Sequence, residues 1–411
     1  MPFAGYECDG CGAIHGPDEA EYRCPGCGGN LFVRSIDSGT TREAIERSAD
    51  RSMWRYAPLL AVPPAGPEHG VMASVGGTPL VPAHGAARRL GVKRLWLKDE
   101  GRMPTGSLKD RASAAVVRRA AAIGVDRVIT ASTGNAGVAL AAMARAGGLD
   151  AVILVPASAP AAKLAQLGIF DATVVLVRGS YDDAFELSVA ASRELGWYCR
   201  NTGLNPFTVE GKKTVSFEIA EQLGWRAPDR IFVPVGDGNI IVAVHRGFAE
   251  LLALGWIDRM PRLVGVQAAG SSPIARAFLD GADHIEPVIT DTLADSIAAG
   301  HPADGLRALR AVRETAGAFV IVSDEDILRA IVSLGREAAI FAEPAAAAAW
   351  AGLCAASSAG QVGDDEDVVV LVTGTGLKDV PAATRALGAH PSPIEPTLEA
   401  LRTVLDRRAN P

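Results

Sequence analysis

Short runs of β-branched residues alternate with alanine-rich stretches along most of this chain of 411 residues. Between residues 126 and 177 the runs are "DRVITAS", "AVILVP" and "ATVVLV", and after residue 228 they are "DRIFVPVG", "PRLVGVQ", "AFVIVSD" and "DVVVLVTG". Strands that alternate with helical patterns are typical of parallel α/β sheets. The first group is closely spaced, whereas longer helical stretches separate the second group. We therefore predict two open parallel-sheet α/β domains, a small one beside a larger one.

Glycine-rich turns follow three of these runs at the carboxyl end, where open parallel sheets bind their ligands. The turns are "STGNAG" after "VITA", "GDGN" after "FVPV" and "TGTG" after "VVLV". None of them forms G-x-G-x-x-G at the start of a helix with an acidic residue about twenty positions later, which argues against a dinucleotide. Three separate turns favour one compact anionic ligand, because the amides of a turn and of a helix N-terminus bind phosphate without a cation.

The composition narrows the choice of partners and location. Hydrophobic residues make up 48% of the chain, enough to bury the cores of two or more domains. Lys and Arg total 40 against 47 for Asp and Glu, and no long basic run is present, which argues against nucleic acid. The stretch "PAAAAAWAGLCAASSAG" is interrupted by serines and predicts a buried helix rather than a membrane span. The N-terminus lacks a basic segment followed by an apolar one, so we expect a cytoplasmic protein.

Four of the six cysteines lie within the first 27 residues, as "CDGC" and "CPGC". This spacing predicts a small zinc ribbon, in which Cys8, Cys11, Cys24 and Cys27 place four sulfurs around one structural ion. A disulfide pair and a redox CxxC motif are the alternatives. A reducing cytoplasm argues against the first, and the missing βαβ context argues against the second. His15 lies between the two pairs and is interpreted as an ordinary surface residue.

Five stretches together resemble the pyridoxal-phosphate enzymes of the tryptophan synthase β-like fold, also called fold type II, and among them the threonine synthases. In chain order they are "PTGSLKDR", "STGNAG", "NPFTVEGKKT", "PVGDGN" and "TGTGLKD". The resemblance covers residues 76–379. It implies a lyase that binds pyridoxal 5'-phosphate between the two α/β domains and acts on a small amino acid. It also implies a homodimer.

The domain boundaries follow from these patterns. A polar and then proline-rich stretch from about residue 38 to 75 is interpreted as a connecting segment. We predict a zinc ribbon over residues 1–37, the connecting segment and the first part of the large domain over 38–107, the small α/β domain over 108–205, and the large cofactor-binding α/β domain over 206–411.

The tripeptide "LKD" occurs three times, with Lys98, Lys109 and Lys378 at its centre. Lys98 lies in a predicted strand and Lys378 in a turn, so both are predicted to be structural or surface charges. Lys109 opens the helical stretch "KDRASAAVVRRAAA", with Ser107 as the expected N-cap. The positive end of the helix dipole disfavours the protonated amine and favours one that bonds to an aldehyde. In the family, this position holds the lysine that binds the cofactor covalently.

The same resemblance implies the other site residues. The turn "GDGN" holds the cofactor phosphate, Asn135 meets the hydroxyl of the cofactor ring, and the turn that ends at Asn135 holds the substrate carboxylate. Thr373 contacts the ring nitrogen, and a neutral hydroxyl there suits elimination of a leaving group. Asp237 replaces a neutral residue, so its carboxylate is expected to face away from the phosphate. The implied cofactor-binding residues are Lys109, Asn135, Gly236, Asp237, Gly238, Asn239 and Thr373, and the implied substrate-binding residues are Ser132, Thr133, Gly134 and Asn135.

Three positions depart from the threonine synthase pattern. The family carries a threonine, a serine and an arginine there to bind the substrate phosphate, and this chain has Ala136, Gly203 and Thr208. A dianionic phosphate normally recruits arginine or several hydroxyl donors. We therefore predict that O-phosphohomoserine is a poor substrate, and that the enzyme removes the α-proton of an unphosphorylated amino acid and eliminates or replaces its β or γ group.

Two alternatives stay open. The first is a true threonine synthase whose phosphate pocket is built from other residues, such as Arg200, Lys212 or Lys213. The second is a non-catalytic regulatory relative in which the zinc ribbon recruits a partner. The intact Lys109 counts against this second alternative.

Overall fold

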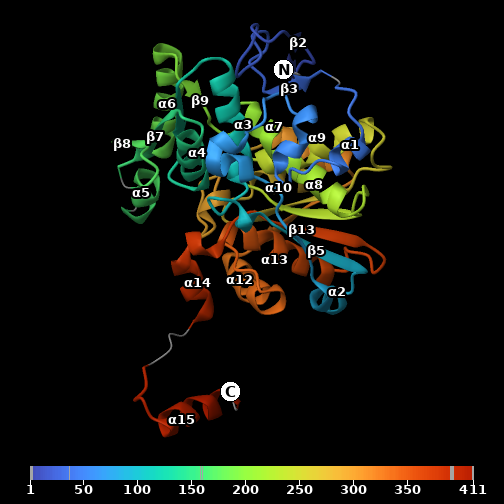
Figure 1. Ribbon diagram of the computed structural model, residues 1–411. Helices are drawn as coiled ribbons and strands as arrows, with labels where there is room; N and C mark the ends of the chain where they lie inside the picture. Colours follow the sequence, from blue (N-terminus) through green and yellow to red (C-terminus); the bar gives the residue numbers. More distant parts are fainter. Residues whose placement is uncertain (1–2, 37, 158, 160, 389–392, 410–411) are drawn as a thin grey trace.

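In the described part of the chain the strands form three separate sheets, and most of the helices pack around the two larger ones (Figure 1). The computed structural model describes residues 3–36, 38–157, 159, 161–388 and 393–409. All seven predicted runs are strands, and each strand begins within one residue of the start of its run. The α/β architecture predicted from the alternating pattern is therefore confirmed.

The largest sheet has six strands in the order β12-β11-β10-β13-β5-β4. Neighbouring strands are parallel except β4 and β5, which are antiparallel. Strands β10 and β13 are buried along their whole length, because helices cover both faces of the sheet, and this explains their continuous apolar sequences. The strands are β4 (Leu80–Pro82), β5 (Arg94–Asp99), β10 (Arg230–Pro234), β11 (Arg262–Ala268), β12 (Ala318–Val322) and β13 (Asp367–Val372).

Two groups of helices cover this sheet. The alanine-rich helix α13 lies directly on β10 to β13, and its Trp350 is fully buried, which confirms the predicted buried helix. The first group is α2 (His84–Leu90), α12 (Asp324–Ala338), α13 (Pro344–Ser358) and α14 (Val380–Leu387). The second group is α8 (Thr214–Gln222), α9 (Asn239–Ala253), α10 (Pro273–Leu279) and α11 (Gly305–Glu314).

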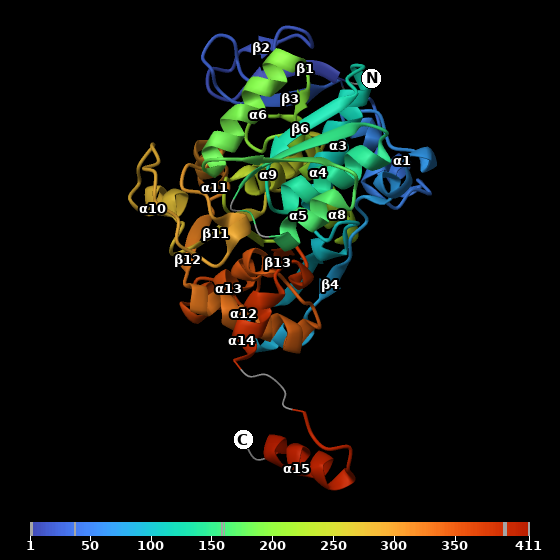
Figure 2. The same ribbon diagram turned by 90° about the vertical axis from the view of Figure 1, so that its left-hand side faces the viewer.

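The smaller sheet has four parallel strands in the order β8-β7-β6-β9. It comes from a stretch of chain between β5 and β10, so it is inserted into the larger sheet's sequence and lies beside it (Figure 2). Its strands are β6 (Arg127–Ala131), β7 (Asp150–Pro156), β8 (Thr173–Val177) and β9 (Tyr198–Cys199). Its helices are α3 (Lys109–Ala122), α4 (Asn135–Ala146), α5 (Ala161–Gly168) and α6 (Tyr181–Leu195).

The N-terminal sheet is antiparallel, with the order β2-β1-β3. It consists of β1 (Phe3–Cys8), β2 (Ile14–His15) and β3 (Leu31–Ser35). Its Phe3 and Tyr6 rings pack on Phe207 of α7 (Phe207–Lys212), with ring centroids 5.6 and 6.3 Å apart. The sheet is therefore anchored to the body of the protein through an aromatic cluster.

The remaining elements are short. The segment interpreted as a connection forms α1 (Arg42–Glu46), η1 (Met53–Leu59) and η2 (Pro67–Ser74), and it buries Trp54 and Met72 against the core. The others are η3 (Glu100–Arg102), η4 (Asp295–Ile297), η5 (Gly376–Lys378) and α15 (Leu398–Ala409), and α15 lies apart from the rest of the chain in both views (Figures 1 and 2). None of the helices in the described part of the chain is long and apolar enough to cross a membrane.

Candidate active site

Three neighbouring strands of the large sheet, β10, β13 and β5, end at the same edge. The segments that follow β13 and β5 are joined by backbone hydrogen bonds: Leu108 N–H donates to the Thr373 carbonyl and Thr375 N–H to the Gly106 carbonyl, both at 2.9 Å. Lys109, the first residue of α3, therefore lies beside the turn that follows β13. This arrangement brings "PTGSLKDR" and "TGTG" together at the carboxyl ends of the strands.

The three lysines of the "LKD" repeats differ in their surroundings. Lys98 is fully buried and its Nζ lies 2.7 Å from a carboxylate oxygen of Glu218, so its role is structural, as predicted. Lys378 is partly buried in η5, where burial lowers its pKa. The side-chain amine of Lys109 makes no hydrogen bond to a residue that the structure describes, and only burial and neighbouring charges act on its pKa. The Lys378 amine likewise has no hydrogen bond among the described residues, so the feature that sets Lys109 apart is its position at the start of α3, beside the turn that follows β13.

Burial is the main cause that lowers the pKa of Lys109 to about 8. The charge of Arg200 lowers it further, while the carboxylates of Asp237 and Glu343 act in the opposite direction. A larger fraction of this amine is therefore unprotonated near neutral pH than for an exposed lysine, and the unprotonated form is the nucleophile.

The predicted capping role of Ser107 is wrong. The residue before α3 is Leu108, which already has helical backbone angles, and no side chain caps the helix. Because an N-cap residue needs an extended backbone, the hydroxyl of Ser107 is not placed to receive the first helical amides. Its Oγ is instead buried without a hydrogen-bond partner among the described residues. This leaves a polar atom in the site available for a ligand.

The turn after β6 leads into α4, which begins at Asn135 with no side-chain cap. The Asn135 amide nitrogen donates to both carboxylate oxygens of Glu343, at 2.9 and 3.0 Å. Glu343 precedes α13 on the large sheet, and burial raises its pKa, against the bond from Asn135 and the charges of Lys378 and Lys109. This contact joins the two sheets across the site. We did not predict Glu343, whose one local signal is its place before the first proline of a helix.

The turn after β10 leads into α9 through Gly236, Asp237 and Gly238. Gly238 has a φ of +91°, and a Cβ there would lie 2.8 Å from the Asp304 carbonyl oxygen, so the turn requires glycine. Helix α9 begins at Asn239 and no side chain caps it. Its first amides are therefore suited to an anion, because the N-terminus of a helix carries unpaired N–H groups and a positive dipole end.

A hydrogen-bonded group lies beneath this turn. Burial and the charge of Asp304 raise the pKa of Asp237, against the charges of Lys109 and Lys212. Lys212 is fully buried and donates to Asn239 Oδ1, and Asn239 Nδ2 donates to Asp304 at 2.6 Å. Burial and the charges of Lys109 and Arg200 lower the pKa of Lys212. This part of the site therefore combines buried basic side chains with the carboxylates of Asp237 and Asp304.

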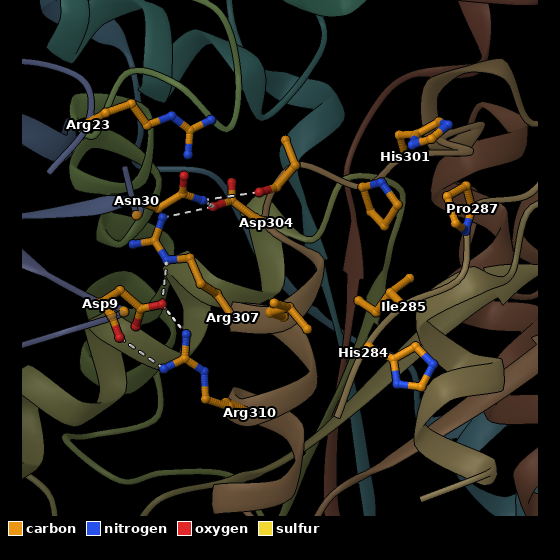
Figure 3. A pocket seen from close by; sticks show the side chains of 15 residues that line it. Asp9, Arg23, Asn30, His284, Ile285, Pro287, His301, Asp304, Arg307 and Arg310 are labelled. Atoms are coloured by element: carbon orange, nitrogen blue, oxygen red, sulfur yellow. Dashed lines mark hydrogen bonds and ion pairs between the residues drawn. The ribbon is translucent and has the colours of Figure 1, made fainter. Parts of the chain in front are cut away.

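Asp304 also lines a cavity of about 560 Å³ between the N-terminal sheet and α11 (Figure 3). Asn30 of the N-terminal sheet donates to Asp304 Oδ1 at 3.0 Å, and Arg307 donates to the same oxygen at 2.8 Å. The N-terminal sheet is thus connected through Asp304 and Asn239 to Lys212. None of the predicted cofactor- or substrate-binding residues lines this cavity.

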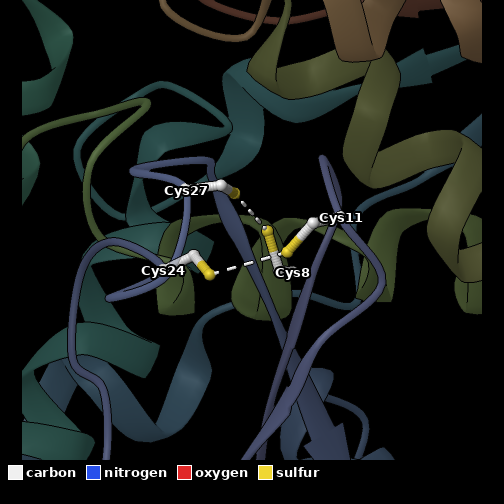
Figure 4. Close-up of side chains that lie close together, drawn as sticks. All are labelled: Cys8, Cys11, Cys24 and Cys27. Carbon is white, nitrogen blue, oxygen red and sulfur yellow. Dashed lines mark hydrogen bonds between the residues drawn. The ribbon is translucent and has the colours of Figure 1, made fainter.

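The four N-terminal cysteines come together at one point, with all of their sulfurs within 4.8 Å of one another (Figure 4). The sulfurs of Cys8 and Cys27 lie 3.4 Å apart, and those of Cys11 and Cys24 lie 3.8 Å apart. A tetrahedral zinc site with bonds of about 2.3 Å places its sulfurs about 3.8 Å apart, so the cluster fits such an ion. His15 lies outside the group, although its Nε2 is 3.3 Å from the sulfur of Cys24.

Comparisons with known proteins agree with this geometry. A family model described as pyridoxal-phosphate dependent enzyme matches residues 71–374. Threonine synthases from Methanosarcina acetivorans and Methanocaldococcus jannaschii are each 38% identical to this chain over 407 and 405 residues, which is 98% and 97% of this chain and 99% and 98% of theirs. Among solved structures, threonine deaminase isoform 2 from Solanum lycopersicum is similar with a TM-score of 0.63 and 23% identity, over 76% of this chain and 87% of that one. The last comparison shows the fold alone.

Proposed function

Because this chain belongs to the pyridoxal-phosphate dependent enzyme family, we propose that it is a threonine synthase, which converts O-phosphohomoserine to threonine and phosphate. The prediction that O-phosphohomoserine is a poor substrate is wrong. It is overturned by relatives named threonine synthase that are 38% identical over 97% or more of this chain. The prediction counted phosphate donors at three aligned positions, and such a count does not register a cation that the fold brings in from elsewhere.

The observation that carries the proposal is the position of Lys109 between two helices whose N-termini no side chain caps, α4 and α9. The pKa of the Lys109 amine is lowered, and the N-termini of α4 and α9 on either side of it can bind anions. This arrangement suits a substrate carboxylate on one side and a cofactor phosphate on the other. The buried and unpartnered Ser107 Oγ supports a bound polar group in the same place.

The roles of the site residues are part of this proposal. Lys109 holds pyridoxal 5'-phosphate covalently and moves the α-proton of the substrate when it is released. When bound, the cofactor supplies an electron-withdrawing ring that makes this proton acidic. Asn135, oriented by Glu343, meets the ring hydroxyl, and Thr373 meets the ring nitrogen. The turn that contains Ser132, Thr133 and Gly134 holds the substrate carboxylate, and the turn of Gly236, Asp237, Gly238 and Asn239 holds the cofactor phosphate.

The test is an assay of the purified holoenzyme with O-phosphohomoserine. We expect threonine and inorganic phosphate to appear in equal amounts, and no 2-oxo acid to form from serine or threonine at a comparable rate. Both products are measured in the same samples, by amino-acid analysis and by phosphate release. Efficient 2-oxo acid formation without threonine would contradict the proposal, and so would a cofactor-loaded protein that turns over none of these substrates.

We also propose that Cys8, Cys11, Cys24 and Cys27 bind one structural zinc ion. Four thiolates leave no open position for catalysis, so the ion stabilises the N-terminal sheet. The fit of the sulfur positions to a tetrahedral site supports this assignment. A ribbon of this kind would hold Asn30 in place for its bond to Asp304.

Replacing Cys24 by serine is expected to remove the zinc while the protein keeps its pyridoxal phosphate. A thiolate ligand is lost, and the metal lies far along the chain from Lys109. The measurement is metal content per chain together with cofactor absorbance. Cys354→Ser, in α13, is the control and should retain one zinc. A freshly purified, reduced wild-type protein without zinc would contradict the assignment.

The remaining proposals concern organisation and setting. We propose the domain boundaries at 37, 107 and 205 as predicted, with the cofactor between the small and large α/β domains. We also propose a homodimer that acts in the cytoplasm on a small amino-acid substrate and binds neither nucleic acid nor membrane.

A further inference from the structure

Of the three cations considered for a substituted phosphate pocket, one keeps a side-chain nitrogen that has no hydrogen-bond partner among the described residues. Lys213 is neutralised, because its Nζ lies 2.9 Å from Glu210 and 2.8 Å from Glu250. Lys212 is bound to Asn239 at the start of α9, on the side where we place the cofactor phosphate. Arg200 remains.

Arg200 directly follows β9, and its backbone N–H donates to Ile129 of β6 at 2.7 Å. It therefore lies at the carboxyl end of the small sheet, next to the turn after β6. Its side chain is fully buried. Nε donates to Ser113 Oγ at 3.3 Å and Nη1 to Thr202 Oγ1 at 2.6 Å, whereas Nη2 has no partner among the described residues. Two nitrogens of the Arg200 guanidinium thus donate hydrogen bonds within the protein, and the third, Nη2, is available to a ligand.

The charge of Arg200 is also uncompensated. Within the described part of the chain, no carboxylate lies at ion-pair distance from Arg200, Lys109 or Lys212. The guanidinium of Arg111, in contrast, is paired with two carboxylates. A buried charge without a partner is unfavourable, and the charge of Arg200 also lowers the pKa of its neighbours Lys109 and Lys212. A dianionic ligand would compensate this charge.

The positions that bind the substrate phosphate in the family cannot do so in this fold. Gly203 has a φ of +75°, and a Cβ there would lie 2.3 Å from the Ala303 Cβ, so a serine does not fit. The Thr208 hydroxyl is buried, donates to the Asn205 carbonyl at 2.7 Å and accepts from Asn239 at 3.3 Å. Ala136 has no polar group. The donor must therefore come from another residue.

We propose that the Arg200 guanidinium binds the phosphate of O-phosphohomoserine through its free nitrogen. The inference rests on the proposed function, because it assigns the substrate's leaving group to this residue. Arg200 lies on the small sheet, beside the turn proposed to hold the substrate carboxylate, whereas the cofactor phosphate turn lies on the large sheet. The two phosphates thus have separate cations, Arg200 for the substrate and Lys212 near the cofactor.

The test compares Arg200→Met and Arg200→Lys with the wild-type holoenzyme. Loss of a charge-assisted hydrogen bond is expected to reduce kcat/KM for O-phosphohomoserine on the order of ten- to a hundredfold in the methionine variant, mainly through KM. Inhibition by inorganic phosphate should weaken by a similar factor. Cofactor content should not change, and the Tm should stay equal or rise, because an unpaired buried charge is removed. Lysine should restore part of the loss.

Arg119→Met is the matched control. Arg119 is also a buried arginine of this region, but its guanidinium stacks on Phe3 and Phe207, at 4.3 and 5.2 Å from the ring centroids. Its replacement should lower the Tm and leave KM and phosphate inhibition unchanged.

The outcomes separate the two proposals. If the wild-type enzyme forms threonine and Arg200→Met has an unchanged KM and phosphate inhibition, the role of Arg200 is wrong and the proposed function stands. If both Arg200 variants lose cofactor or fail to fold, Arg200 is structural, and the inference is overturned. If the wild-type enzyme forms no threonine from O-phosphohomoserine, the proposed function itself fails.

Discussion

Replacing Lys109 by alanine is expected to reduce threonine formation by roughly a thousandfold or more, because one side chain both holds the cofactor and moves the α-proton. Positioned proton transfer alone contributes on the order of 10² to 10⁴ to a rate. The pKa of Lys109, lowered by burial to about 8, keeps part of the amine unprotonated at neutral pH. The measurements are the rate of phosphate release and the mass of the protein after borohydride reduction with bound pyridoxal phosphate.

The pH dependence gives a second check on the same residue. Because protonation removes the nucleophile, the rate at which cofactor-free wild-type protein binds pyridoxal phosphate covalently should fall as the pH drops below about 8. An ordinary lysine would lose reactivity already below about 10.4. Lys378→Ala is the control for the reduction experiment and should keep the adduct on Lys109. An adduct found on Lys98 or Lys378 would show that the assignment is wrong.

The fold could be predicted where a strand is marked by a continuous run of several apolar residues. The strands β6, β7, β10, β11 and β13 are apolar runs because helices bury both of their faces. Strands β4 and β9 were not predicted, since with 3 and 2 residues they are too short to show a period. The proline-rich segment before residue 75 was interpreted as a connection, and yet Trp54 and Met72 are buried there. Burial of that kind depends on what the segment contacts.

The site residues also fall into two groups: those that a local motif predicts, and those whose role depends on packing. Glycine turns and the lysine motif are local, so "GDGN", "STGNAG" and Lys109 could be placed from the sequence. The bond from Asn135 to Glu343 joins residues 208 positions apart and depends on how the two sheets meet. The free nitrogen of Arg200 is equally a product of packing, because it follows from the bonds that Ser113 and Thr202 make with the other two. We propose that the substrate prediction failed for this reason, because Arg200 supplies the donor that the three aligned positions lack.

A buried cluster of charges holds the helix that carries Lys109. Arg111, two residues further along α3, lies 2.7 Å from Glu100 and 2.6 Å from Glu218, and Lys98 lies 2.7 Å from the other oxygen of Glu218. All four side chains are buried. The charges of Arg111 and Lys98 hold the pKa of Glu218 well below its usual range despite its burial. The cluster joins α3 to β5, η3 and α8, and so it fixes the position of Lys109 at the start of α3.

Replacing Glu218 by glutamine is therefore expected to lower the free energy of unfolding by about 3–5 kcal/mol, because Lys98 loses its buried counter-ion and Arg111 keeps one of two. The stabilisation in the wild type should be complete above the unfolded pKa of glutamate, about 4.3, and be lost as the pH falls through the lower folded value. Denaturant unfolding of the cofactor-loaded protein measures the difference. Asp150→Asn is the matched control, since its pair with Arg127 is exposed and should change stability far less. Equal losses in the two variants would mean that the cluster does not stabilise α3, and the precise placement of Lys109 would then need another cause.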